Sequence, residues 1–191
     1  MVAAAAVPPL VAVVALVVVP AVNLVVSTLD AGALSGVLGD ERVWEVVWFS
    51  LWQAVVSTAV TVAVGVWPAI VVARHRFRGR AVFIGGLTAV FVLPTVVLAA
   101  GVQVVLPGEW ARGASAIVVA HVVFNLAVVV RTVAAAPVPV GLEEAARTLG
   151  ASRMRVALRV TLPLLAPALW SAAAVVLLFS FTSFGVVRVL G

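Results

Sequence analysis

The polar side chains with chemical potential gather in two places of an otherwise apolar sequence. Two adjacent carboxylates, Glu143 and Glu144, precede Arg147 in a polar stretch. A carboxylate can form a charge-assisted, bidentate hydrogen bond with an arginine of another protein. His121 and Asn125 lie four residues apart in an apolar segment and would share one face of a helix. The first group indicates partner recognition. The second indicates either a lining of a pathway or hydrogen bonds between helices, and we favour hydrogen bonds.

Catalytic arrangements are not evident in the sequence. It contains no cysteine and no lysine, which excludes thiolate chemistry and the lysine of a nucleotide-binding P-loop. No His/Glu metal cluster, no Ser/His/Asp constellation and no acidic residue within an apolar run is present. We therefore expect no catalytic residue, no metal site and no cofactor. An intramembrane enzyme and a proton-coupled carrier are both disfavoured.

Composition identifies a membrane protein. Of 191 residues, 65% are hydrophobic and 10% are charged, and the mean hydropathy is +1.30. Several apolar runs approach the roughly 20 residues that a helix needs to cross a bilayer. Unpaired backbone groups are costly in lipid, so the runs should be helices. We expect an all-α integral membrane protein forming a single domain over 1–191. It has about five transmembrane helices, near 8–29, 51–73, 81–102, 115–136 and 164–187, and a helical loop over 137–163.

Arginine placement predicts the orientation in the membrane. Four arginines lie within the segment from Arg74 to Arg80, and the loop over 137–163 is also rich in arginine. The positive-inside rule puts both segments in the cytoplasm, together with the N-terminus. The net charge of +5 is thus interpreted as topology and not as a nucleic-acid surface. A short interfacial helix is expected over Glu41–Phe49. Four tryptophans near the outer boundary are expected to form an aromatic belt: Trp44, Trp48, Trp52 and Trp110.

Polar residues and prolines also occur inside the expected spans. Gln53, Ser57 and Thr61 form a polar stripe on the second span, which favours hydrogen bonds to a neighbouring helix. Prolines can kink membrane helices, and three lie within spans: Pro20, Pro68 and Pro94.

The loop over 137–163 has the pattern of two short helices. Leu142, Ala145, Ala146 and Leu149 follow the spacing of one helical face. Glu143 and Arg147 are spaced for an i,i+4 ion pair, and Gly150 stands where a left-handed cap would end the helix. A second helix is expected over Ser152–Thr161, closed by Pro163. The first helix suits docking to a soluble partner. The alternative, a helix lying on the inner leaflet, is less favoured because its apolar face lacks Phe and Trp and its carboxylates would face anionic lipid.

The loop resembles the EAA loop of binding-protein-dependent ABC importer permeases. The pattern runs from Glu144-Ala145-Ala146 through Gly150 to Val160-x-Leu162-Pro163, with Val160 where isoleucine is usual. Other segments are similar to the ferric-iron and thiamine branch of the family. They are Leu51–Ala54 with Ser57–Thr58, Val92–Val96, Ala120–Asn125 and Ser180–Gly185.

The resemblance implies a permease that is not itself an enzyme. Its partners would be a cytoplasmic ATP-binding subunit, an extracytoplasmic solute-binding protein and a second permease half, in the plasma membrane of a prokaryote. Ferric iron is the favoured solute and thiamine the next. The family usually has a sixth span and, in this branch, a second EAA loop, so we expect the N-terminal half of a longer permease, incomplete at its C-terminus. The alternative is a non-transport scaffold that recruits a soluble partner through the loop. The implied ATPase-docking residues are Glu143, Glu144, Ala145, Ala146, Gly150 and Pro163.

Overall fold

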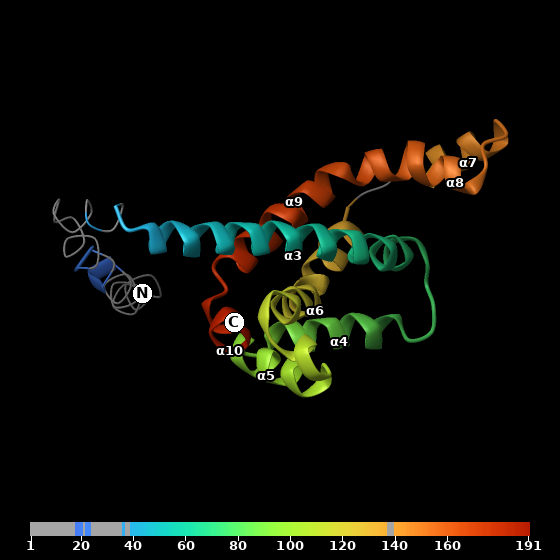
Figure 1. Ribbon diagram of the computed structural model, residues 1–191. Helices are drawn as coiled ribbons and strands as arrows, with labels where there is room; N and C mark the ends of the chain where they lie inside the picture. Colours follow the sequence, from blue (N-terminus) through green and yellow to red (C-terminus); the bar gives the residue numbers. More distant parts are fainter. Residues whose placement is uncertain (1–17, 21, 24–35, 37–38, 137–139) are drawn as a thin grey trace, which may run out of the picture. The chain divides into compact units, whose positions relative to one another are not determined.

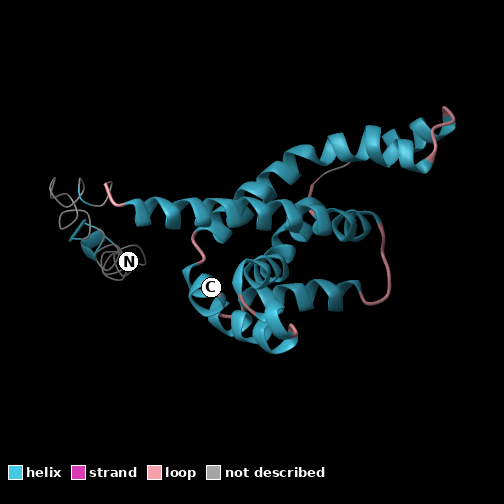
Figure 2. Cartoon of the chain, in the orientation of Figure 1, coloured by secondary structure: helices cyan, strands magenta, loops and turns pink. Residues whose placement is uncertain are grey.

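The structure is a computed structural model that describes residues 18–20, 22–23, 36, 39–136 and 140–191. Every regular element within these ranges is a helix (Figures 1 and 2). The span expected over 8–29 lies mostly outside the described residues. The chain divides into two compact units, Met1–Phe49 and Ser50–Gly191. The second unit holds all the candidate sites.

Helix α3, Glu41–Arg74, contains the expected span over 51–73. The separate interfacial helix predicted over Glu41–Phe49 is wrong, because these residues are the first turns of α3 itself. No glycine or proline interrupts the segment, and the Asp40 carboxylate accepts a hydrogen bond from the Arg42 N–H (3.0 Å) at its start. Pro68 lies within α3 without ending it.

The span expected over 81–102 is broken in two. Helix α4, Arg80–Val92, and helix α5, Thr95–Val105, meet at an angle of 109°. Pro94 has no N–H to continue the helix, and the residue before a proline is driven out of the helical region. Leu93 accordingly has an extended conformation, with φ −61° and ψ 140°. The prediction of one continuous helix here is wrong, and the effect of Pro94 is a full break.

The two remaining spans lie where the sequence predicts them, but one ends early. Helix α6, Gly113–Ala134, follows the short 3-10 turn η1, Gly108–Ala111, and matches the span expected over 115–136. Helix α9, Leu162–Phe181, stops before the predicted end of the span over 164–187, and a separate helix α10, Phe184–Leu190, follows (Figure 1).

Three described helices are long and apolar enough to cross a membrane, or four if α4 and α5 are counted as one bent span. These are α3, α6 and the continuous helix Arg153–Phe181. The structure therefore supports an all-helical membrane protein, and the number of five spans stays a prediction. The aromatic belt also stays a prediction. The side chains expected to form it are exposed: Trp44, Trp48, Trp52 and Trp110.

The core of the second unit lies where helices α3, α6 and α9 meet. Buried aliphatic side chains from all three pack together, among them Val72, Val129 and Val176. A second buried cluster joins α5, α6 and α10 around Ile117 and Leu190. Helix α6 contributes to both clusters, so it is the central element of the unit.

Gly65 permits the close approach of α3 to α6. A Cβ atom at Gly65 would lie 2.8 Å from Cγ1 of Val129, closer than packed carbon atoms tolerate. We expect Gly65→Ala to destabilise the fold by about 1–3 kcal/mol, as overpacking of a full core does. Gly85→Ala in α4 is the matched control, because no atom of the described residues lies within 4 Å of its Cβ position. Thermal unfolding in detergent should show a lower Tm for Gly65→Ala alone; equal values for the two variants would contradict the close packing.

Candidate functional site

The first helix of the polar loop, α7, spans Val140–Thr148 and ends in a glycine cap. Gly150 has a φ of +83° and donates its N–H to the Arg147 carbonyl (3.0 Å). The Ala151 N–H reaches back to the Ala146 carbonyl (3.0 Å). These two bonds and the left-handed glycine form a Schellman cap. The predicted cap at Gly150 is therefore confirmed.

The second helix of the loop runs directly into the membrane span. Helix α8, Arg153–Val156, begins at Ser152, whose hydroxyl accepts a hydrogen bond from the Arg155 N–H (3.3 Å). A π-helical turn, η2, Ala157–Thr161, then connects α8 to α9. The prediction that Pro163 closes the second helix is wrong. Pro163 occupies the first turn of α9, and the wider turn before it lets the helix continue.

One face of α7 is uncovered. Leu149 is 89% exposed and Leu142 is 48% exposed, while Glu144 and Ala145 are also exposed. Exposed apolar side chains beside a carboxylate are typical of an interaction surface. Ala146 is less exposed and lines a small hollow of about 290 Å³, together with Leu149, Arg155 and Arg159. We call the exposed set Leu142, Glu144, Ala145 and Leu149 the docking face.

Glu143 points away from the docking face. Its Oε1 atom lies 2.6 Å from Nη2 of Arg74, at the end of α3. The same oxygen accepts a hydrogen bond from the Thr161 hydroxyl in η2. Both charged side chains are partly buried, with 13% of Arg74 and 24% of Glu143 exposed. One carboxylate thus joins α3, α7 and the base of α9.

This arrangement corrects one expectation about Glu143. Within the described residues it pairs with Arg74, and the predicted i,i+4 ion pair with Arg147 is not formed. Its side chain is also occupied within the chain, unlike the exposed Glu144. The sequence did not predict the contact, because Arg74 belongs to the arginine run that is interpreted as a topology signal, with a lipid headgroup site as the alternative.

His121 and Asn125 lie in a buried polar seam between α3, α6 and α9. Ser57 Oγ is 3.2 Å from His121 Nδ1, which connects α3 to α6. Asn125 Nδ2 donates to Ser180 Oγ (3.4 Å), which connects α6 to α9. Gln53 Nε2 donates to the Ser180 carbonyl (3.0 Å), which connects α3 to α9. We call this fully buried set the polar seam: Gln53, Ser57, Thr61, His121, Asn125 and Ser180.

Comparison with known proteins assigns the chain to a family. Residues 61–191 match the family of binding-protein-dependent transport system inner membrane components. The chain belongs to this family. It is also similar to the thiamine transport system permease protein ThiP of Salmonella typhimurium, with 32% identity over 112 residues. The match covers 50% of this chain and 21% of the relative, so the chain spans about a fifth of the length of that protein. The resemblance to an ABC importer permease of the ferric-iron and thiamine branch is thereby confirmed.

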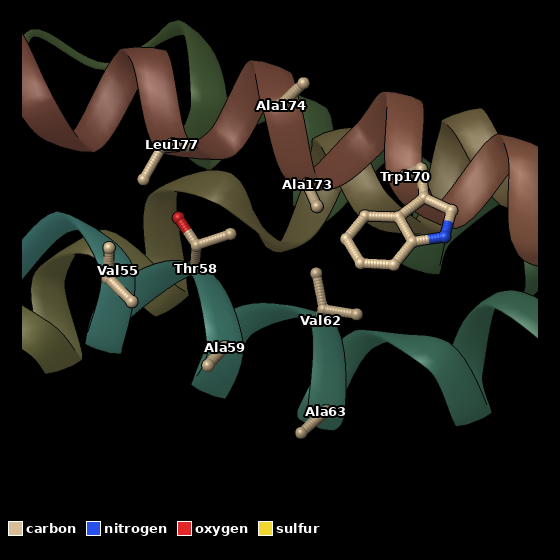
Figure 3. A pocket seen from close by; sticks show the side chains of 9 residues that line it. All are labelled: Val55, Thr58, Ala59, Val62, Ala63, Trp170, Ala173, Ala174 and Leu177. Atoms are coloured by element: carbon tan, nitrogen blue, oxygen red, sulfur yellow. The ribbon is translucent and has the colours of Figure 1, made fainter.

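A groove of the permease lies between α3 and α9 (Figure 3). It has a volume of about 600 Å³, and Val62 and Ala173 face one another across it beside the indole of Trp170. Thr58 supplies its one hydroxyl, which donates to the Ala54 carbonyl (2.7 Å). The groove offers apolar contacts and hardly any hydrogen bonds, so it does not suit a polar solute.

Glu143→Ala should loosen α7 from the membrane helices. A partly buried ion pair contributes about 1 kcal/mol, so we expect amide hydrogen exchange in α7 to accelerate about five-fold. The charge swap Arg74→Glu with Glu143→Arg should restore slow exchange. Glu144→Ala is the matched control from the neighbouring position and should change little. Equal exchange in the Glu143 and Glu144 variants, measured in the purified permease, would rule out the contact with Arg74.

Proposed function

We propose that this chain is a permease component of an ATP-driven importer that receives movement from a cytoplasmic ATP-binding subunit. The observation that carries the proposal is the docking face, an uncovered surface on a firmly capped helix. A short helix with small and apolar residues can enter a groove of a soluble partner. The exposed Glu144 carboxylate would then meet a basic side chain of that partner.

The contacts of Glu143 give the docking helix two connections to the pathway. A force on α7 reaches α3 through Arg74 and reaches α9 through Thr161. The second route is direct, because the loop helix is continuous from Arg153 to Phe181. Movement of the loop would therefore tilt or shift α3 and α9 together. In this way, ATP-driven closure of the ATP-binding subunits would change access to the pathway.

The solute and the partners follow from the family. The similar permease from Salmonella typhimurium is named for thiamine transport, and this now favours thiamine over ferric iron as the solute. An extracytoplasmic binding protein would deliver it, and a second permease half would complete the pathway in a prokaryotic plasma membrane. A non-transport scaffold would use the same docking face, but membership of a transport family favours the permease.

Substitutions on the docking helix should uncouple ATP hydrolysis from transport. Glu144→Arg reverses the exposed charge, and Gly150→Pro cannot adopt the φ of +83° that the cap requires. We expect the double variant to lose about ten-fold or more of its solute-stimulated ATPase activity, the scale of removing an interface hot spot. Glu109→Arg, an exposed carboxylate in η1, is the control and should retain activity. Wild-type stimulation and uptake in the double variant, reconstituted with the binding protein and the ATP-binding subunit, would overturn the proposal.

The proposed orientation can be tested because the chain has no native cysteine. A cysteine at Arg78, between α3 and α4, should be protected from a membrane-impermeant thiol reagent in intact cells, since that segment would be cytoplasmic. A cysteine at Glu109 in η1 should be labelled under the same conditions. Permeabilised cells give the total reactivity of each position. Labelling at Arg78 in intact cells would reverse the topology.

A further inference from the structure

A second cavity of the permease lies where two helices break. It has a volume of about 310 Å³ and is lined at the α4–α5 break by Phe91 and Thr95, and at the α9–α10 break by Thr182. Helix α6 contributes His121 and Phe124 to the same lining. Transporter sites are commonly built at discontinuous helices, where backbone and side-chain polar groups become available.

Three phenylalanines give the cavity an aromatic wall. The ring centroids of Phe91 and Phe124 are 4.9 Å apart, and those of Phe91 and Phe179 are 5.9 Å apart. Both distances lie in the range of favourable aromatic contacts, so the three rings hold one another in place. A flat ring entering the cavity would find preformed aromatic surfaces with little loss of side-chain freedom.

His121 lines this cavity and carries one unpaired polar atom. The side chain is 1% exposed, and its Nδ1 atom lies 3.2 Å from the Ser57 hydroxyl in the polar seam. Its Nε2 atom is buried and has no hydrogen-bond partner among the residues that the structure describes. Leaving such an atom unpaired costs free energy. A hydrogen bond from a bound molecule would remove that cost.

Hydroxyl groups complete the lining. Gly185 lets α10 approach the start of α5, because a Cβ at this position would lie 2.7 Å from Thr95 Oγ1. This close approach brings the Thr95 hydroxyl to the break that contains Thr182. The Thr182 hydroxyl donates to the Leu178 carbonyl (2.8 Å), so its oxygen can still accept a hydrogen bond.

We propose that this cavity binds the ring of a small heteroaromatic solute on its way through the membrane. The solute would place its ring against the phenylalanines and its polar edge toward His121 Nε2 and the two hydroxyls. The residues that line the cavity are uncharged, so a positively charged ring would be held by the aromatic faces. The inference rests on the proposed permease function and adds the site and the chemical class of its ligand.

Thiamine is the probe for the test, because it is a positively charged heteroaromatic molecule and the solute that the family comparison favours. Uptake of radiolabelled thiamine is measured in proteoliposomes that hold the full permease, the ATP-binding subunit and the binding protein. Phe179→Leu and Phe181→Leu form a matched pair. Both residues lie in α9 with similar exposure, 39% and 46%, but Phe179 lines the cavity and Phe181 does not.

We expect Phe179→Leu and His121→Gln to raise the apparent KM for thiamine about ten-fold, as loss of one aromatic or hydrogen-bonding contact does. Phe181→Leu should stay within about two-fold, and Phe179→Trp should recover most of the affinity because it restores an aromatic face. ATPase stimulation by the docked binding protein should persist in Phe181→Leu, which lies outside the cavity lining. If the wild-type complex imports thiamine and Phe179→Leu matches Phe181→Leu, the cavity is not the site. If the wild type does not import thiamine, the proposed solute fails instead.

Cysteine protection provides a readout that does not depend on turnover. Thr182→Cys in the assembled complex should react with a small thiol reagent, and thiamine should slow that reaction several-fold. Ser171→Cys, exposed on α9 away from the cavity, should react equally with and without thiamine. Unchanged labelling of Thr182→Cys at saturating thiamine would overturn the proposal and indicate that lipid or the second permease half fills the cavity.

Discussion

The arrangement of this permease depends on the need to pair polar groups away from water. The polar seam meets that need in part. It joins three helices with side-chain hydrogen bonds, and Ser180 accepts from both Gln53 and Asn125. Nε2 of His121 stays unpaired among the described residues. Hydrogen bonds of this kind contribute about 0.6–2 kcal/mol each in a membrane. These hydrogen bonds also fix the rotation of each helix about its own axis. A helix turned by one residue would bury the same polar groups without partners. The aliphatic core and the cavity at the helix breaks are both built on that fixed alignment.

The two adjacent carboxylates of the loop have different environments. Glu143 is bound by Arg74 and Thr161 within the chain, whereas Glu144 is exposed on the docking face. Neighbouring residues on a helix project about 100° apart, so one can hold the helix down while the other faces outward. A helix that passes on the movement of a partner needs both properties, since a loosely held helix would absorb that movement.

Local signals predicted much of this structure. The lengths of the apolar runs indicated α3, α6 and α9, and Gly150 indicated the end of α7, because these features depend on neighbours in sequence. The pairing of Glu143 with Arg74 could not be predicted, since it joins residues far apart in the chain. The sequence also did not predict that helices would be interrupted at Pro94 and at Thr182. Hydropathy stays high through both, and a proline alone does not distinguish a bend from an interruption, as Pro68 within α3 shows.

The π-helical turn η2 sets how far α9 is rotated about its axis relative to α8, within the continuous helix Arg153–Phe181. Such a turn contains one residue more than an α-helical turn, so everything beyond it is rotated by about 100° relative to an uninterrupted helix. Arg155 lies before the turn and Phe179 lies after it. Which side of α9 faces the aromatic wall is therefore decided more than ten residues away, at the end of α9 that follows the polar loop. A single inserted or deleted residue in Ala157–Thr161 would leave the hydropathy of the span unchanged and turn its lining toward lipid.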